Sequence, residues 1–206
     1  MTSPHCGLVV ITGGPGSGKT TLVNLLHEAG FATAPEAGRA IIQDQTAIGG
    51  PALTDPALRA ELDLCWDLRS YRWALAQPAP VFFDHALPGL PVHYQLTARP
   101  VPAHVEAAIA TFRYRPQVFL APWWPEIYRN DAERRQTLAE ARQTHEAIVE
   151  AYSRRGYQLI ELPRADPQER LRFVLESLPV PRAEAVPTQR DLGRARPHPG
   201  PGTEPR

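Results

Sequence analysis

The chain is poor in cysteine and has no net charge, and both absences restrict its function. Its 206 residues contain only Cys6 and Cys65, which are far apart and fit no metal-ligand spacing. We interpret them as reduced thiols of an intracellular protein. Lysine plus arginine and aspartate plus glutamate both number 22, so the net charge is zero. The overall charge therefore does not predict nucleic acid or an anionic membrane as the main partner.

Long apolar runs are also missing from the chain. No stretch approaches the ~20 apolar residues that cross a bilayer as a helix. The apolar run Leu8–Ile11 has the length of a strand, and the residues before it are few and polar, unlike the core of a secretory signal. These absences predict a cytoplasmic protein without a membrane partner.

Short apolar runs alternate with longer amphipathic segments, and 43% of the residues are hydrophobic, which is enough for a packed core. The apolar runs predict five strands, at Gly7–Thr12, Phe31–Ala34, Pro80–Asp84, Gln117–Ala121 and Tyr157–Leu162. The segments between them predict helices at Thr20–Ala29, Ala37–Ile48, Asp55–Gln77, Val92–Leu96, Ala103–Tyr114, Asp131–Arg155 and Pro167–Leu178. Buried strands that alternate with helices predict an α/β fold, with a parallel sheet covered on both faces.

The composition changes at Pro179. From there to Arg206 the chain is rich in proline and arginine and has almost no large apolar side chains. Such a segment cannot bury a core, although it could serve as a basic docking segment. We therefore predict one folded domain over residues 1–178 and a disordered tail over residues 179–206.

Residues 13–20 read G-G-P-G-S-G-K-T and match the phosphate-binding pattern G-x-x-x-x-G-K-[ST] in full, between a predicted strand and a predicted helix. Glycines let consecutive backbone N–H groups turn towards phosphate oxygens, and the helix adds its positive N-terminal end. We expect ATP or GTP to be held by Gly14, Pro15, Gly16, Ser17, Gly18, Lys19, Thr20 and Thr21. Lys19 should reach the β and γ phosphates as a catalytic residue, and Thr20 should ligate Mg²⁺.

Three classes of P-loop protein compete, and short signatures separate them. A Ras-type GTPase needs D-x-x-G and N-K-x-D, but residues 84–87 read D-H-A-L and residues 130–132 read N-D-A. An AAA+ or helicase motor usually carries a second acid after its strand-end aspartate, and His85 stands there instead. A small-molecule kinase needs a core of this size, a strand-end acid and an arginine-rich lid. The sequence favours that third class.

Two acids end predicted strands at the edge where parallel sheets bind ligands. Asp84 is a candidate to hold the Mg²⁺ shell or the acceptor hydroxyl, and a simple turn residue is the alternative. Glu36 is a candidate catalytic base or acceptor-binding residue, and a carboxylate favoured by the helix dipole is the alternative. Arg39, three residues later, is a candidate to bind substrate or to pair with Glu36.

An arginine-rich run follows the fourth predicted strand. Asn130 and Glu133 fit a capping box, which would put Arg134 and Arg135 in the first turn of the next helix. Cations are unfavourable at that end of a helix, so the pair suggests that an anion is expected there. We interpret Arg134 and Arg135 as a catalytic clamp on the transferring phosphoryl group, and Arg129 as a weaker nucleotide contact. A solvated pair bonded to nearby acids is the alternative.

Three ionisable side chains stand out elsewhere. Arg69 falls on the apolar stripe of residues 55–77, which predicts a buried arginine that binds either the acceptor or a structural acid. His145 lies on the apolar stripe of residues 131–155 and predicts a hydrogen-bonded core histidine. His85 is a weaker candidate for the site itself.

The sequence resembles a family of short bacterial ATPases labelled AAA. That family is grouped with the nicotinamide riboside kinase domain of the NAD regulator protein and with a trafficking GTP-binding protein of eukaryotes. The resemblance rests on residues 9–39, on V-F-F-D-H-A-L-P from residue 81 and on V-F-L-A-P-W-W-P-E-I-Y-R-N-D-A-E-R-R from residue 118. It implies a kinase-like P-loop fold, ATP binding and phosphoryl transfer, with Lys19, Thr20 and Asp84 in matching positions. An arginine usually follows the strand-end acid in that family, so His85 is a departure.

These features together predict a P-loop kinase fold with five parallel strands in the order 2-3-1-4-5 and a short arginine-rich lid. The predicted reaction moves the γ-phosphoryl group of ATP to a hydroxyl of a small, nucleoside-like molecule, with Mg²⁺ as cofactor. Two alternatives stay open. One is a regulatory switch that hydrolyses ATP or GTP and acts through a protein partner; the other is a toxin-like kinase that modifies a macromolecule or a cell-wall precursor.

Overall fold

The computed structural model describes residues 4–128 and 136–178, which contain one five-stranded sheet. Its strands are β1 (Leu8–Thr12), β2 (Ala32–Ala34), β3 (Val81–Asp84), β4 (Gln117–Leu120) and β5 (Gln158–Glu161). All neighbouring strands pair in parallel, in the order β2-β3-β1-β4-β5. The predicted sheet and strand order are confirmed, and each strand begins and ends within one residue of its prediction.

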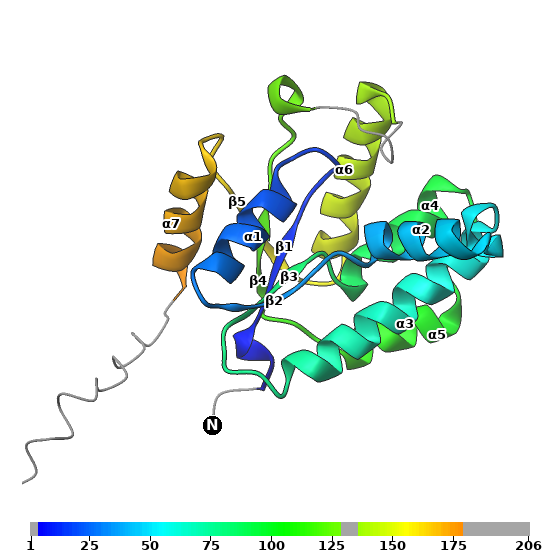
Figure 1. Cartoon of the computed structure of the whole chain (residues 1–206), viewed down its shortest axis with the longest axis horizontal. Helices are drawn as coiled ribbons and strands as arrows, with labels where there is room; N and C mark the ends of the chain where they lie inside the picture. Colours follow the sequence, from blue (N-terminus) through cyan, green and yellow to red (C-terminus); the bar gives the residue numbers. More distant parts are fainter. Residues whose placement is uncertain (1–3, 129–135, 179–206) are drawn as a thin grey trace, which may run out of the picture.

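Helices cover both faces of this sheet. The α-helices of the described residues are α1 (Lys19–Glu28), α2 (Ala37–Ile48), α3 (Pro56–Ala74), α4 (Pro91–Leu96), α5 (Ala103–Thr111), α6 (Leu138–Ser153) and α7 (Pro167–Ser177). Figure 1 shows α1 and α7 on one side of the sheet and α3, α5 and α6 on the other, while α2 and α4 extend away from its edge. The result is the predicted three-layer sandwich.

Strand β1 explains why both faces need a cover. All five of its residues are buried. Leu8 and Val10 belong to the apolar cluster shared with α3, α5 and α6, whereas Val9 and Ile11 belong to the cluster shared with α1 and α7. Burying an aliphatic side chain of this size contributes about 1.5–3 kcal/mol. The loop that follows β1 therefore starts from a firmly packed base.

Helix α6 begins later than predicted. The prediction started it at Asp131, but residues 136 and 137 are not helical and the first helical residue is Leu138. The Glu140 backbone N–H donates to Thr137 Oγ1 at 3.2 Å, and the Thr137 backbone N–H donates to Glu140 Oε2 at 2.7 Å. This capping box satisfies two N–H groups reciprocally and fixes the start of α6.

The later start of α6 removes one argument for the lid. The first turn of α6 contains neither Arg134 nor Arg135, so the prediction that both occupy it is wrong. Both arginines lie outside the described residues, as do Arg129, the predicted Asn130–Glu133 capping box and residues 179–206. Their predicted roles stay predictions.

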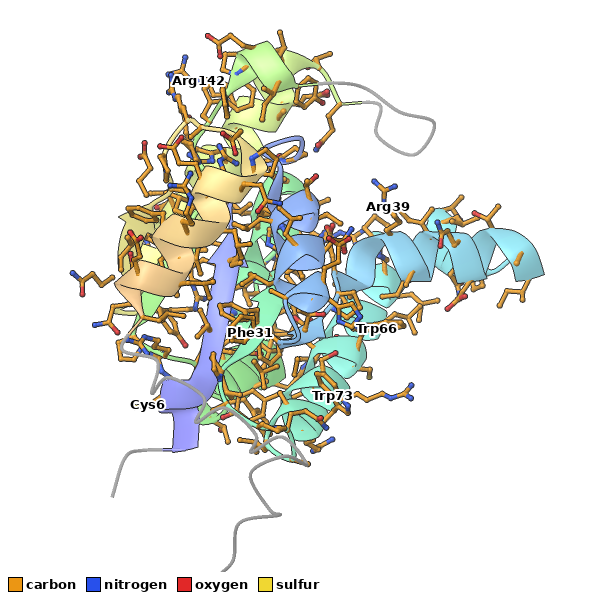
Figure 2. The ribbon with its side chains drawn as sticks, turned by 60° about the vertical axis from the view of Figure 1, so that its left-hand side comes forward. Cys6, Phe31, Arg39, Trp66, Trp73 and Arg142 are labelled. Atoms are coloured by element: carbon orange, nitrogen blue, oxygen red, sulfur yellow. The ribbon has the colours of Figure 1, made fainter. Side chains whose placement is uncertain are left out.

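Helix α3 turns a different face inward from the one predicted. Arg69 is exposed, so the prediction that it is buried is wrong, and Trp73, labelled in Figure 2, is 42% exposed. The buried residues of α3 are Ala60, Asp63, Leu64, Tyr71 and Ala74. Apolar volume alone favoured the wrong face, because the inward face includes two alanines and an aspartate.

In the part of the chain that the structure describes, no helix has the length and apolar character to cross a membrane. The loops that leave the carboxyl ends of β1, β2 and β3 meet at one edge of the sheet. That edge carries the candidate site.

Candidate functional site

The phosphate-binding loop joins β1 to α1, as the sequence predicts, and its glycines are required by geometry at two positions. Gly13 has φ +137°, and a Cβ added there would be 2.5 Å from the Ala121 carbonyl oxygen. Gly16 has φ +73°, and a Cβ there would be 2.6 Å from Tyr128 Cδ2. Other residues are strained at such φ values and would clash as well. The loop thus packs too closely against Ala121 and Tyr128 to admit a side chain at either position.

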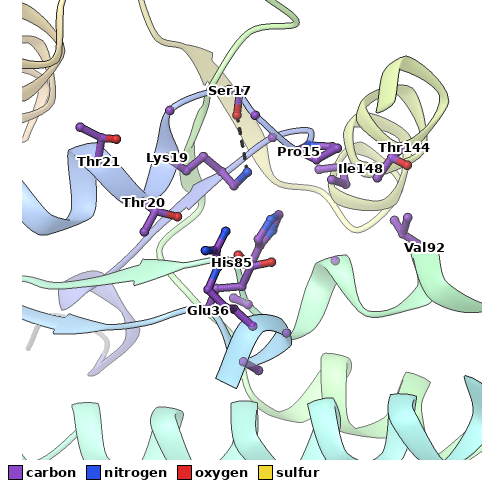
Figure 3. Close-up of a pocket in the computed structure, with 18 of the residues that line it drawn as sticks. Pro15, Ser17, Lys19, Thr20, Thr21, Glu36, His85, Val92, Thr144 and Ile148 are labelled. Atoms are coloured by element: carbon purple, nitrogen blue, oxygen red, sulfur yellow. Dashed lines mark hydrogen bonds between the residues drawn. The ribbon is translucent and has the colours of Figure 1, made fainter. Parts of the chain in front are cut away.

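Lys19 lies folded into the loop. Its side chain is buried, with the residue 6% exposed, and Nζ donates to the Gly14 carbonyl oxygen at 2.8 Å. Nζ is also 3.5 Å from Ser17 Oγ, the contact drawn as a dashed line in Figure 3. Ser17 Oγ donates to the same Gly14 carbonyl at 2.8 Å. The ammonium is therefore held where the phosphates of a nucleotide are expected.

Thr20 and Asp84 form the candidate metal site. Thr20 Oγ1 donates to Asp84 Oδ2 at 2.7 Å, which joins the start of α1 to the end of β3. Asp84 is 3% exposed. A hydroxyl and a carboxylate are the hard oxygen donors that Mg²⁺ prefers, and this ion usually keeps waters and phosphate oxygens as its other ligands. A group of three or more His, Cys, Asp or Glu side chains that could hold a metal is absent from the described residues. This pair therefore fits Mg²⁺ bound together with a nucleotide.

Two side chains from distant helices hold the loop in place. The Gly14 backbone N–H donates to His145 Nδ1 of α6 at 3.3 Å. Arg170 of α7 is 3% exposed, and its Nη1 donates to the Ser17 carbonyl oxygen at 2.7 Å. Arg170 Nε donates to the Pro163 carbonyl oxygen at 2.9 Å, and its guanidinium lies over the Trp124 ring at 5.0 Å. The predicted hydrogen bond of His145 is confirmed, but its partner is the phosphate-binding loop and the side chain is only half-buried.

His85 lies in the middle of the site, on the side of the cleft that faces Lys19 (Figure 3). Its φ is +66°, and its backbone N–H donates to the Ile11 carbonyl oxygen at 3.0 Å. His85 Nδ1 is 3.2 Å from Thr12 Oγ1. Burial, followed by the ammonium of Lys19, lowers the pKa of His85 to about 4. The imidazole is therefore neutral at physiological pH.

A single cleft of about 1030 Å³ connects the phosphate-binding loop to a second wall made by α2, α3 and α4. Glu36 and Arg39 both line it, so the structure brings these predicted acceptor residues to the site. Figure 2 shows the Arg39 side chain rising from α2. Arg69 does not line the cleft. Its predicted place beside the acceptor is not supported.

Several charged residues of this second wall were missed by the sequence analysis. Arg59 Nε donates to Asp63 Oδ2 at 3.1 Å, and Arg59 Nη2 donates to the Gly38 carbonyl oxygen at 2.9 Å. His93 Nε2 is 3.4 Å from the same Asp63 Oδ2. Burial raises the pKa of Asp63, although His93 and Arg59 oppose this. Asp63 Oδ1 has no hydrogen-bond partner among the described residues.

Asp67 lies one helical turn beyond Asp63 and also lines the cleft. Burial raises the pKa of Asp67 to about 8, and the nearby carboxylates of Asp63 and Glu36 act in the same direction. The spacing of Arg59, Asp63 and Asp67 at i, i+4 and i+8 was the available signal, because such residues share one helix face.

The two described segments that flank the predicted lid end at Tyr128 and resume at Gln136, and they lie close to the phosphate-binding loop. The Tyr128 hydroxyl donates to the Gln136 carbonyl oxygen at 2.7 Å, and the Tyr128 ring packs against Gly16. Trp124 and Ile127, from the same stretch, line the cleft together with Gln136. The described parts of the lid therefore border the site.

Sequence comparison links the chain to one family. The sequence model of that family, described as AAA domain, matches residues 8–170, which include the phosphate-binding loop and every residue that lines the cleft. No protein of curated function matches the chain significantly.

Structural comparison gives relatives of the same fold at low identity. The crystal structure of NadR protein in complex with NR aligns with a TM-score of 0.64 at 17% identity, over 85% of this chain and 52% of that one. This chain thus spans about half the length of NadR. A deoxyadenosine kinase from M. mycoides, with dcmp and dcdp bound, gives 0.58 at 14% identity over 83% and 97% of the two chains. A thymidylate kinase from Ehrlichia chaffeensis gives 0.55 at 12% identity over 82% and 96%.

Proposed function

The chain belongs to the AAA domain family, and on that premise we propose that it is a kinase that transfers the γ-phosphoryl group of ATP to a hydroxyl of a small molecule. The observation that carries the proposal is the single cleft. Its first wall is a phosphate-binding loop, and its second wall, on α2, α3 and α4, carries ionisable side chains that can bind an acceptor. A site built only to hydrolyse a nucleotide needs no second wall of this size.

The reaction needs little covalent chemistry from the protein, because phosphoryl transfer depends mainly on positioning and charge neutralisation. The loop N–H groups and Lys19 would hold the phosphates, while Thr20 and Asp84 would hold Mg²⁺. When bound, that ion neutralises charge on the β and γ phosphate oxygens. The acceptor oxygen forms a bond to the γ phosphorus, and the bond from that phosphorus to the bridging oxygen of ATP breaks. ADP leaves, and the hydroxyl proton passes to Glu36, the candidate base.

Nucleotide consumption with and without acceptors tests this proposal. ADP formation from ATP should rise at least tenfold with one or more compounds in pools of nucleosides, vitamins and sugars. Lys19→Ala should abolish the increase, since Lys19 stabilises the charge that moves during transfer. Lys19 is also the only lysine in the sequence, so protecting it with ATP from an amine-reactive reagent locates the nucleotide without relying on turnover. Nucleotide binding without any acceptor stimulation, but with capture of a protein partner, would favour the regulatory switch.

The arginine-rich lid supplies a second prediction. Arg134→Ala with Arg135→Ala should lower kcat by about 100-fold or more, because arginines on a transferring phosphoryl group stabilise its transition state. The Kd for ATP should change little. Arg142→Ala is the matched control, since this exposed arginine of α6 pairs with Glu146 in solvent. An unchanged kcat in the double variant excludes the clamp.

A further inference from the structure

The second wall of the cleft carries three carboxylates and two arginines, Arg39 and Arg59, but neither arginine bonds Asp67. Glu36, Asp63 and Asp67 all line it. Arg59 is shared among several partners: it bonds Asp63 and the Gly38 carbonyl. It also approaches Glu36, because a Cβ added at Gly38 would be 3.1 Å from Arg59 Nη2 and 3.3 Å from Glu36 Oε1. The Arg59 guanidinium thus bonds at the Asp63 end of the wall, and none of its hydrogen bonds reaches Asp67.

One carboxylate oxygen of Asp63 and the carboxylate of Asp67 lack a donor among the described residues. The Asp63 side chain is 7% exposed, yet its Oδ1 makes no hydrogen bond with any described residue. Asp67 makes no hydrogen bond or ion pair within the described residues, although its side chain reaches the cleft. A buried carboxylate oxygen without a donor costs about 1–3 kcal/mol or more, so such groups are rarely retained without a purpose. Both lie on one face of α3, one turn apart.

The pKa of Asp67 agrees with its lack of a bonded cation. Burial and the neighbouring carboxylates raise the pKa of Asp67, which is the response of an acid that has no positive partner. Burial also lowers the pKa of His93, so this imidazole supplies little positive charge near Asp63. Apolar side chains also line the cleft, among them Val92 of α4 and Ile148 of α6.

We propose that the acceptor carries an ammonium group that docks between Asp63 and Asp67, and therefore that the substrate class is amine-bearing hydroxyl compounds. An ammonium supplies several N–H donors, which Asp63 Oδ1 and Asp67 lack, and a positive charge, which Asp67 lacks. Val92 and Ile148 then pack against the carbon skeleton of the acceptor, while its hydroxyl points towards the phosphate-binding loop. This inference rests on the proposed kinase function.

The same wall disfavours anionic acceptors. A phosphate monoester or a carboxylic acid placed between Asp63 and Asp67 would face the negative charge of Asp63 and would oppose ionisation of Asp67, which lowers affinity in a desolvated site. A neutral polyol can donate to the two carboxylates but leaves their charge uncompensated. The second wall thus discriminates between acceptors by their charge, whereas the fold alone does not predict which charge is preferred.

Matched acceptors test this proposal. We would compare amine, neutral and anionic members of three scaffolds: glucosamine, glucose and glucuronate; an aminodeoxyadenosine, adenosine and AMP; and serinol, glycerol and glycerate. Each is assayed for stimulated ADP formation and, separately, for a rise in Tm in the presence of ADP. The amine member of at least one scaffold should have a kcat/KM at least tenfold above its neutral counterpart.

Two variants of α3 assign the effect to the wall. Asp67→Asn should raise the KM for the preferred amine at least tenfold and remove its effect on Tm, while the KM for ATP stays unchanged. Glu61→Gln is the matched control, since Glu61 lies on α3 like Asp67, pairs with His104 of α5 and does not line the cleft. A retained ATP-induced rise in Tm shows that the Asp67 variant is folded.

The outcomes separate this inference from the proposed function. Preference for neutral or anionic members, no response to any amine, or an unchanged KM in Asp67→Asn each overturns the ammonium site. The kinase proposal is judged by the larger acceptor pools and by Lys19→Ala, which do not depend on amines. An acceptor without an amine would therefore support the kinase and reject the site proposed here.

Discussion

Gly16 lies where the backbone and a neighbouring ring both exclude a side chain. Its φ of +73° is in the left-handed region, and the Tyr128 ring occupies the space of a Cβ. Tyr128 in turn bonds Gln136 across the lid segment. Gly16 therefore lets the Tyr128 ring pack directly against the phosphate-binding loop.

Gly16→Ala should weaken ATP binding at least tenfold and lower Tm, because the strained φ and the 2.6 Å contact act together. Gly156→Ala separates the two effects. Gly156 has a similar φ of +77°, but no atom lies within 4 Å of its added Cβ. The control should lose only about 1 kcal/mol of stability and keep its affinity for ATP. Equal affinities in both variants would show that the Tyr128 contact does not matter.

The second wall shows why single residues were harder to predict than the loop. Glu36 could be predicted because it follows a strand at the binding edge. Asp63 and Asp67 could not, because an acid within a helix is usually a solvated residue. Whether such an acid faces solvent or a cleft depends on which side of α3 packs against the sheet.

At the scale of elements, α7 supports the loop that binds phosphate. Arg170 spans from α7 to the Ser17 carbonyl and is buried under the Trp124 ring. Its guanidinium is also bonded to the Pro163 carbonyl, after β5. Helix α7 thus fixes the loop from the face opposite α6, where His145 bonds Gly14.

Arg170→Met should raise the Kd for ATP about tenfold or more and lower the free energy of unfolding, since hydrogen bonds of a buried charged group contribute about 1.5–3 kcal/mol each. Methionine keeps most of the volume of the side chain. Arg172→Met, two residues along α7 at an exposed position, is the control and should change neither quantity. Isothermal titration with ATP and thermal unfolding measure both. Wild-type affinity in the Arg170 variant would assign this arginine to packing alone.

At the scale of the molecule, the described core is complete before the proline-rich segment begins at Pro179. Val174 and Leu178 are buried in the cluster that covers one face of β1. The family match also ends within α7, at residue 170. The described core and the cleft are therefore assembled by residue 178.

A chain ended after Leu178 should keep the Tm of the full chain within about 2 °C and retain acceptor-dependent ADP formation. The reason is that the apolar clusters and the cleft draw all their described residues from before residue 179. Differential scanning calorimetry of the two chains checks this. A fall of several degrees, or loss of turnover, would assign residues 179–206 a structural or functional role.

Local signals in the amino-acid sequence were enough to predict the parallel sheet and the phosphate-binding loop, and the strand order followed from the P-loop kinase fold that these features and the family resemblance indicate. Apolar runs mark buried strands, and a glycine-rich motif between a strand and a helix marks the loop. Strand-end acids were equally readable, so the pattern of residues predicted that Thr20 and Asp84 lie together, and they are hydrogen-bonded. The same reasoning assigned Glu36 and Arg39 to the cleft that they line.

The faces of the helices that meet the site depend on the assembled layers. Packing leaves Arg69 at the surface, α6 starts at Leu138, and Asp63 and Asp67 turn into the cleft. Helix periodicity fixes which residues share a face, whereas contacts between layers decide which face is buried. The charge of the acceptor wall depends on that choice, and it therefore follows from the tertiary structure.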